Sequence, residues 1–192
     1  MPLLRPLRDY NEKDVINLYT FSGQTSTTQI INKGTLVQIV NGWRSDTEPT
    51  EILGSYGDFS VNNVQALRYG TPAKVTYFGT GTGTFVGERP IGITLFDVRE
   101  LDENLIPLKY NPRKTAELEA CISGQTVPIV TRGTFLYSGL TGTILGGQPL
   151  YGATSGTISA VTGASGIGTQ QIGIALGGTG ADGSALIRLG LW

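Results

Sequence analysis

Histidine is absent from this chain of 192 residues, and cysteine occurs only once, at Cys121. Without an imidazole, the relays that activate a serine or cysteine nucleophile cannot be assembled. One thiol cannot close an intrachain disulfide or build a zinc site of four thiolates. The sequence therefore predicts no metal, no other cofactor and no enzymatic activity. Because Cys121 lies in an apolar alternation with no histidine to activate it, we expect a buried, unreactive thiol.

Charged residues are also scarce: they make up 15% of the chain, against about a quarter in typical proteins, and the formal net charge is −1. Because nucleic acids are held by clustered positive charge, we expect no nucleic-acid partner. No apolar run approaches the length of about 18 residues that a membrane span needs, and prolines and charges interrupt residues 1–9, unlike a signal peptide. These features predict a chain that is made in the cytoplasm and does not associate with membranes.

Glycine, by contrast, is abundant, with 28 residues, of which 17 fall after residue 119. The same segment holds only three charged residues, Arg132, Asp182 and Arg188. Each glycine inside a helix costs about 1 kcal/mol relative to alanine, so this density argues against helices. Apolar runs rich in β-branched and aromatic residues recur between the glycines, as in strands separated by turns. They include residues 35–40, 73–78, 91–95, 127–130, 134–137, 172–176 and 185–189. The sequence therefore predicts an all-β fold.

Residues 112–120 are the one window with helical character. Pro112 is suited to the first position of a helix. However, Ala116, Leu118 and Ala120 alternate with polar residues, which is the period of a strand with one buried face. We therefore favour an edge strand here, with a helix as the alternative.

An internal repeat gives the most information about the architecture. Residues 30–37 and 129–136 agree position by position: an apolar pair, a polar residue, a base, Gly-Thr and a second apolar pair. Each half continues with a Gly-x-Pro turn and later an Ile-Gly-Ile strand. Two related antiparallel units can close their sheets on each other and bury both apolar faces. We therefore predict a compact β-barrel or β-sandwich built from two such units.

The same pattern divides the chain into three parts. Residues 1–20 mix leucines, prolines and charges without a clear period, and are predicted to be an extended N-terminal arm. Residues 21–119 form the first β unit and residues 120–192 the second, Gly/Thr-rich one. Residues 41–69 have no counterpart in the second half, so we interpret them as an insertion within the first unit.

Two kinds of segment invite a chemical interpretation. The glycine-rich stretches 79–84 and 163–168 are followed neither by Lys-Ser/Thr nor by a helix, so we interpret them as hairpin tips, not phosphate loops. Glycoside hydrolysis needs only two carboxylates about 5–10 Å apart. The candidates are Asp97, Glu100, Asp102, Glu103, Glu117 and Glu119. Most of them lie in the polar stretch 97–103, which is more simply a solvated connection.

The two ends of the chain are the candidate interaction segments. The arm is either a frayed terminus or a strand that pairs with a neighbouring chain. The closing run is too apolar for a free tail, so we expect it to dock within the sheet or against another subunit. The interface candidates are Leu3, Leu4, Arg5, Leu7, Arg8 and Tyr10 in the arm, and Leu189, Leu191 and Trp192 in the closing strand.

The Lys/Arg-Gly-Thr turn, the Gly-x-Pro entry to a strand, the two Ile-Gly-Ile strands and the closing Leu-Ile-Arg-Leu-Gly-Leu resemble the head-decoration, or capsid cement, proteins of tailed bacteriophages. The resemblance covers roughly residues 28–192. It implies a compact β-barrel or β-sandwich that assembles as a homo-oligomer. The oligomer is commonly a trimer, and a dimer is the alternative. It implies binding to the outside of the capsid at junctions of the major capsid protein, with an N-terminal arm that reaches along the shell.

From this resemblance we expect a structural virion protein, synthesised in the host cytoplasm and located on the outer capsid surface. The alternative is a tail or receptor-binding module that uses aromatic side chains to bind host glycans. Trp43 and Tyr56 are the aromatic residues on which that alternative would be tested.

Overall fold

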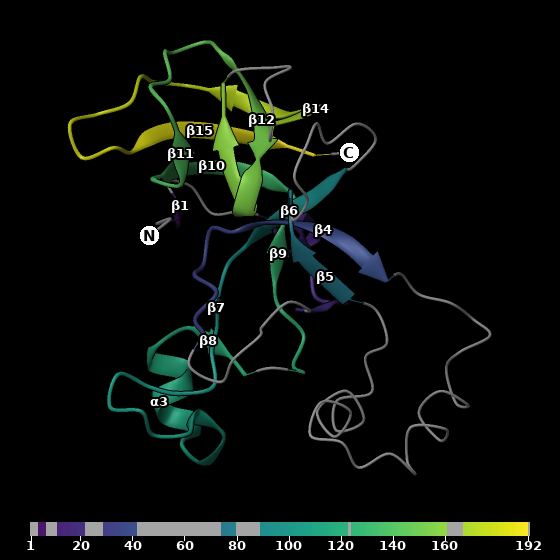
Figure 1. Cartoon of the computed structure of the whole chain (residues 1–192), viewed down its shortest axis with the longest axis vertical. Helices are drawn as coiled ribbons and strands as arrows, with labels where there is room; N and C mark the ends of the chain where they lie inside the picture. The colour runs from purple at the N-terminus through teal and green to yellow at the C-terminus, as the bar shows by residue number, and fades with distance from the viewer. Residues whose placement is uncertain are drawn as a thin grey trace.

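The computed structural model describes residues 4–6, 11–21, 29–41, 74–79, 89–122, 124–160 and 167–191 (Figure 1). Within these ranges the chain forms a seven-stranded sheet, a six-stranded sheet and a two-stranded sheet, with one α-helix and three short 3-10 helices. The predicted all-β class is therefore confirmed.

The seven-stranded sheet, called sheet A, is the upper part of the molecule in Figure 1. Its strands come from the second half of the chain, apart from β1, which pairs antiparallel with β10. All of its pairs are antiparallel except that of β11 with β13. In order across the sheet they are β1 (Leu4–Pro6), β10 (Arg132–Tyr137), β15 (Ala185–Gly190), β14 (Ile167–Ala175), β12 (Pro149–Ala153), β13 (Thr157–Ser159) and β11 (Leu140–Thr141). The 3-10 helix η4 (Thr154–Gly156) joins β12 to β13.

The six-stranded sheet, called sheet B, comes mainly from the first half of the chain. Its strands pair antiparallel, except β3 with β5. In order they are β2 (Val15–Ile16), β9 (Ile129–Val130), β6 (Pro90–Thr94), β4 (Leu36–Asn41), β5 (Lys74–Tyr77) and β3 (Thr20–Phe21). The 3-10 helix η1 (Glu12–Asp14) leads directly into β2.

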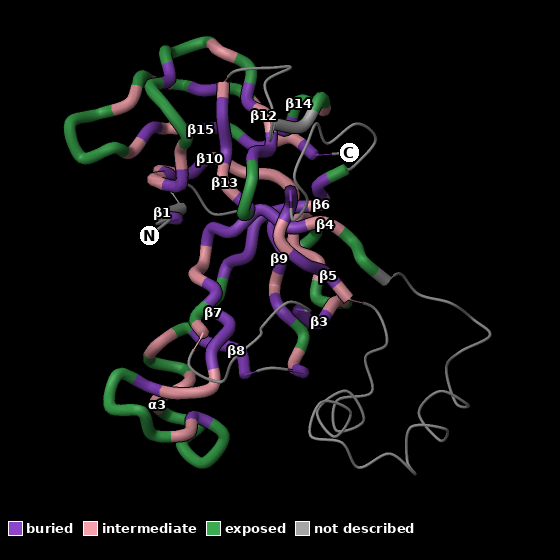
Figure 2. Tube along the Cα trace, in the orientation of Figure 1, coloured by how far each residue is buried: buried purple, intermediate pink, exposed green. Residues whose placement is uncertain are grey.

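One hydrophobic core joins sheet A to sheet B, as expected for two units that close on each other. Its members include Leu36, Phe78, Ile93 and Val130 from or beside sheet B, and Phe135, Tyr137, Leu150, Ile158, Ile172, Ile187 and Leu189 from sheet A. Buried residues accordingly gather where the two sheets meet (Figure 2). The Tyr137 hydroxyl donates a 2.8 Å hydrogen bond from sheet A to the carbonyl oxygen of Gly34. A second core, which includes Val37 and Ile129, shows that sheet B is buried on both faces.

The two Ile-Gly-Ile strands share a physical reason for their glycine. A Cβ atom at Gly92 in β6 would overlap the Val130 carbonyl group of the adjacent strand β9. A Cβ atom at Gly173 in β14 would overlap the Arg188 carbonyl oxygen of the adjacent strand β15. At both positions the neighbouring backbone passes too close for any side chain.

The Lys/Arg-Gly-Thr motif behaves differently in the two halves. Lys33 and Gly34 form a turn before β4, as predicted. Arg132 and Gly133 are instead the first residues of β10, opposite Gly190 and Leu189. The second motif is therefore not a turn, because the chain passes there from one sheet to the other.

A small satellite extends from sheet B, and its α-helix lies at the lower left of Figure 1. Its base is the parallel pair of β7 (Asp97–Val98) and β8 (Ala120–Cys121). Between these strands the chain forms the 3-10 helix η3 (Leu108–Tyr110) and the helix α3 (Pro112–Glu117).

The helix α3 corrects the prediction of an edge strand at residues 112–120. The Asn111 side chain accepts a hydrogen bond from the Lys114 N–H and caps the helix, and Pro112 occupies the first helical position. The helix ends before Glu119, whose φ of 46° is left-handed. Of the three alternating residues Ala116, Leu118 and Ala120, only Ala120 lies in a strand, β8. The local capping contacts therefore outweigh the alternating pattern that predicts a strand.

The division of the chain between the sheets follows the topology. The chain passes from sheet B to sheet A at Thr131, between β9 and β10. The boundary between two β units at residues 119 and 120 stays a prediction. Residues 1–20 contribute β1 to sheet A and β2 to sheet B. The predicted insertion at 41–69 lies outside the described residues, apart from Asn41 at the end of β4.

Candidate functional site

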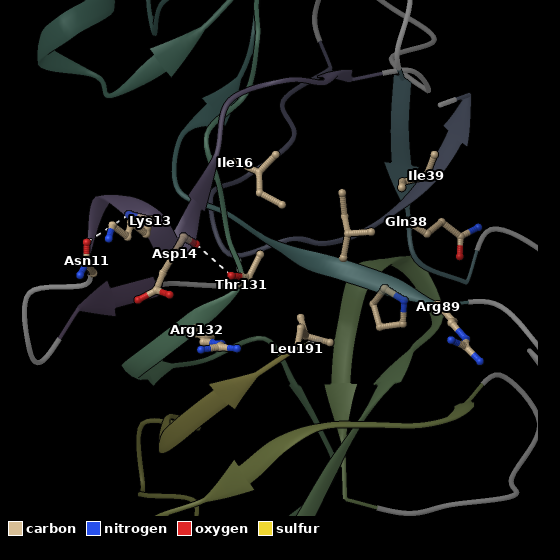
Figure 3. Close-up of a pocket in the computed structure, with 12 residues that line it drawn as sticks. Asn11, Lys13, Asp14, Ile16, Gln38, Ile39, Arg89, Thr131, Arg132 and Leu191 are labelled. Carbon is tan, nitrogen blue, oxygen red and sulfur yellow. Dashed lines mark hydrogen bonds between the residues drawn. The ribbon is translucent and has the colours of Figure 1, made fainter. Parts of the chain in front are cut away.

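An open groove of about 1080 Å³ lies where the two sheets diverge; we call it the intersheet groove (Figure 3). Its apolar lining consists of Ile16, Ile39, Pro90, Ile91 and Leu191, and its polar lining consists of Asn11, Lys13, Asp14, Gln38, Arg89, Thr131 and Arg132. These residues come from both ends of the chain and from the strands β4, β6 and β10. The groove therefore exists only in the folded protein.

Two irregularities of sheet B open the groove. The register between β4 and β6 shifts from Val37 opposite Gly92 to Gln38 opposite Pro90, which leaves Ile91 as an extra, bulged residue. A bulge bends its strand and redirects the neighbouring side chains. In addition, β9 pairs with β6 only at Ile93 and Thr94. On the side away from β4, the beginning of β6 therefore borders the groove instead of β9.

Thr131 holds the two ends of the chain together beside the groove. Its backbone N–H donates to the Asp14 carbonyl oxygen at 2.8 Å, and its side-chain hydroxyl donates to the same oxygen at 3.1 Å. Its own carbonyl oxygen accepts from the Leu191 N–H at 3.1 Å. Thr131 is thus the residue at which the chain changes sheet and the residue that joins the arm to the closing strand.

The segment before β2 forms one wall of the groove. The Asn11 carbonyl oxygen accepts from the Asp14 N–H at 2.8 Å, and the Asn11 side chain accepts from the Lys13 N–H at 3.2 Å. These bonds fix η1 and direct Lys13 and Asp14 to the groove. The antiparallel pairing of Val15 with Val130 then anchors this wall to sheet B.

The rim of the groove is polar and mostly cationic. Lys13 and Arg89 are exposed, and neither forms an ion pair with another described residue. Arg132 adds a third cation and Asp14 a carboxylate. The side-chain oxygen of Gln38 is buried without a hydrogen-bond partner in the described part of the chain. An apolar floor with charges of both signs at the rim suits a protein segment.

The residues predicted as interfaces in the arm fall in several places. Leu4 is 5% exposed and packs in the core between the sheets, and β1 pairs with β10 of its own chain. This pairing within the chain differs from both predictions for the arm, a frayed terminus and a strand that pairs with a neighbouring chain. The backbone of Arg5 lies opposite Leu136 in that pair. Leu3, Leu7, Arg8 and Tyr10 lie outside the described residues, and their interface role stays a prediction.

The closing strand is docked within sheet A, the first of the two arrangements expected for it. Leu189 lies opposite Gly133 and Gly173, and is 2% exposed. Leu191 is 5% exposed and reaches the groove. Trp192 lies outside the described residues.

The thiol and two of the carboxylates that the sequence offered as reactive groups are engaged in hydrogen bonds or ion pairs. The Cys121 thiol is buried and donates to the Thr126 carbonyl oxygen at 3.5 Å, and burial raises its pKa to about 11. Asp97 accepts a hydrogen bond from the Lys33 N–H at 2.7 Å. Glu103 pairs with Lys114, and a backbone hydrogen bond lowers the pKa of this carboxyl. These contacts describe a thiol in the core and carboxylates that organise the satellite.

Several of the sequence's other candidates lie outside the described residues: Trp43, Tyr56, most of the glycine stretch 79–84 and residues 163–166. In the part of the chain that the structure describes, no cluster of three or more His, Cys, Asp or Glu side chains could hold a metal ion. No helix in those ranges is long and apolar enough to cross a membrane.

Most of the groove has no signal in the sequence. The roles of Gln38, Ile39 and Arg89 depend on the bulge in β6 and on the departure of β9 towards sheet A. Pro90 before the Ile-Gly-Ile run is the one local signal, since proline in a strand is typical of edges and bulges.

Comparison of the sequence with models of protein families found no match, and comparison with curated proteins found none either.

Proposed function

We propose that this chain is a structural virion protein. It binds the outer surface of a phage capsid as a homo-oligomer and stabilises the junctions of the major capsid protein. The observation that carries the proposal is the meeting of the N-terminal arm, at residues 11–16, and the end of the closing strand at one open groove, where Thr131 bonds the residue before β2 and the residue after β15. Of the predicted interface residues that the structure describes, Leu191 lines this groove. Two chain ends that are distant in sequence thus contribute to one accessible surface.

The form of the groove supports binding of a macromolecule. Small-molecule pockets are typically enclosed and about 300–1,000 Å³ in volume. The intersheet groove is open, and its floor is apolar while its rim carries charges, as in protein interfaces.

A rigid scaffold is sufficient for the proposed role. A ligand that binds only the assembled shell stabilises that shell by mass action, and no catalytic group is required. Many equivalent copies act together, so each contact need supply only modest affinity. The double-sheet core, with the Tyr137 hydrogen bond between its halves, provides the rigidity.

The proposal is tested by co-sedimentation with expanded capsids of the phage that encodes this chain. We expect the wild-type protein to sediment with the capsids in a stoichiometric amount. Arg89→Glu places a negative charge at the groove and should weaken binding about tenfold or more. Arg188→Glu makes the same charge change on the exposed face of sheet A, outside the intersheet groove, and should leave binding unchanged.

Absence of capsid binding by the folded wild-type protein would contradict the proposal. So would electron micrographs of the native particle in which the protein is found only at the tail tip. Equal losses for both arginine variants would show that the contact depends on overall charge and not on this groove.

A further inference from the structure

The N-terminal arm is fastened to both sheets through one stretch of chain. Thr131 alone separates β9 from β10, so residues 129–137 run from sheet B into sheet A. β2 pairs antiparallel with the sheet B part of this run, and β1 pairs antiparallel with the sheet A part. Residues 11–14, which form one wall of the intersheet groove, lie between β1 and β2 in the sequence. The segment that contains this wall is therefore anchored at both ends to the same run.

The two paired segments differ in length between these anchors. The pairs on either side of the wall are Pro6 with Phe135 and Val15 with Val130. Between them lie eight residues of the arm and four of the opposing run, namely 7–14 and 131–134. The arm therefore departs from the run and returns to it. Its extra length includes η1, from which Lys13 and Asp14 reach the groove (Figure 3).

The anchor in sheet A depends on one side chain. β1 has three residues, and its Pro6 has no N–H group to donate to β10. Leu4 is the residue of β1 that the structure places in the core between the sheets, where it is 5% exposed. A short edge strand with few backbone hydrogen bonds opens locally at low cost unless its side chains are buried. Burial of Leu4 is therefore what keeps β1 docked.

The anchor in sheet B is independent of Leu4. The Asp14 carbonyl oxygen accepts from both the N–H and the hydroxyl of Thr131, and Val15 pairs with Val130. These contacts hold the end of the wall that leads into β2. When β1 leaves sheet A, the wall is held at that end only. A segment held at one end samples more conformations than a segment held at both ends.

We propose that Leu4 is a positioning residue for the intersheet groove, and that the groove is fully formed only while β1 is docked in sheet A. Leu4 does not line the groove, so it acts through the arm that follows it. The inference rests on the proposed function, because it names what regulates the same surface. A partner that binds the groove after β1 has left must order the wall again, which lowers the affinity.

Amide hydrogen exchange of the full-length protein, without capsids, tests this inference. The reporter is the Thr131 N–H, which donates to the Asp14 carbonyl oxygen on the wall. The reference is the Leu95 N–H, which donates to the Pro128 carbonyl oxygen at 2.9 Å, away from the arm. The ratio of the two exchange rates separates loosening of the wall from loss of global stability.

Three variants of the full chain are compared with the wild type, and circular dichroism establishes that each is folded. Leu4→Ala removes the anchor. Leu150→Ala is the matched control, because Leu150 is 0% exposed in the same core but lies on β12, outside the arm. Leu4→Met keeps the volume of the side chain and is the rescue variant. Leu4→Val replaces Leu4→Ala if the alanine variant does not fold.

We expect the exchange-rate ratio of Thr131 to Leu95 to rise about tenfold or more in Leu4→Ala, because loss of the buried side chain favours the state in which β1 has left. The ratio should stay at the wild-type value in Leu150→Ala and in Leu4→Met. Leu4→Val, which removes less volume, should give a smaller rise in the same direction.

A distance measurement across the groove provides the second readout. Spin labels are attached at Lys13→Cys and Arg89→Cys, two exposed positions of the groove lining, and the native Cys121 is buried. The distribution of distances between the labels should be narrow in the wild-type and Leu150→Ala backgrounds. It should become broad in the Leu4→Ala background, since the wall then has one anchor.

The inference is overturned by an exchange-rate ratio that is unchanged in folded Leu4→Ala or that rises equally in Leu150→Ala. A distance distribution that is the same in both backgrounds also overturns it. None of these results depends on capsids. If the exchange and distance effects occur but the wild type does not bind capsids, the proposed function fails and the role of Leu4 stands.

Discussion

The Tyr137 hydrogen bond gives a sharp test of how the two sheets are held together. Tyr137 is completely buried in sheet A, and its hydroxyl donates to Gly34 before sheet B. Among the described residues, the Gly34 carbonyl oxygen has no other hydrogen bond. Tyr137→Phe keeps the ring in the core and leaves that carbonyl oxygen unsatisfied. Loss of a partner by a buried polar group costs about 1–3 kcal/mol, so we expect the free energy of unfolding to fall by about 2 kcal/mol.

Urea denaturation followed by circular dichroism measures this change. The midpoint should fall while the slope stays constant, and Tm should fall by about 4–8 °C for a chain of this size. Tyr110→Phe is the matched control, because that ring is 76% exposed, and it should change the stability by less than about 0.5 kcal/mol. A Tyr137→Phe variant as stable as the control would show that the hydroxyl does not link the sheets.

The same residue makes stability depend on alkaline pH. Burial raises the pKa of the Tyr137 hydroxyl well above its ordinary value of 10.0. Below pH 10.0 both the folded and the unfolded chain keep the Tyr137 proton, so the hydroxyl's contribution to stability is fully present. Above pH 10.0 the unfolded chain loses this proton while the folded chain keeps it, so the free energy of unfolding falls. At pH 11 the difference between the wild type and Tyr137→Phe should shrink by about 1.4 kcal/mol. A difference that is constant from pH 8 to pH 11 would contradict this.

Three further changes test separate features. Gly173→Ala should lower the free energy of unfolding by roughly 1–3 kcal/mol in urea titration, because its Cβ would meet the Arg188 backbone, whereas Gly190→Ala, where a Cβ meets open space, should be nearly neutral. Leu105→Gly should raise Tm by relieving a positive φ worth up to about 1 kcal/mol, and an unchanged or lower Tm would argue against strain there. Cys121, with a pKa of about 11, should react with a thiol reagent at pH 8 only after denaturation; rapid labelling of the native chain would contradict its burial.

Short-range signals predicted the all-β class and several of its strands. The runs at 35–40, 91–95 and 185–189 fall on β4, β6 and β15, because alternating β-branched residues fit a half-buried pleated surface. The repeated Ile-Gly-Ile pattern was also informative, since Gly92 and Gly173 meet the same steric demand in different sheets. Such demands act on one residue and its immediate surroundings.

Local signals were misjudged where two of them competed. At residues 112–120 the alternation predicts a strand, whereas Pro112 is suited to the start of a helix, and the helix forms. In the structure the Asn111 side chain caps α3 and Pro112 occupies its first position, so the first turn is fixed by local contacts. The second Gly-Thr motif resembles the first, so the sequence predicts a turn there as well. Instead β10 begins at this motif, which the local sequence does not reveal.

The sequence by itself therefore determined the class of fold and the burial of the lone thiol, because each depends on composition or on neighbouring residues. Tertiary structure decided the rest: that β1 joins sheet A, that Thr131 joins the arm to the closing strand, and that a bulge at Ile91 opens the groove. These features arise from backbone pairing between segments that lie far apart in the sequence. Since every residue carries the same backbone donor and acceptor, the sequence does not encode such pairings in any local pattern.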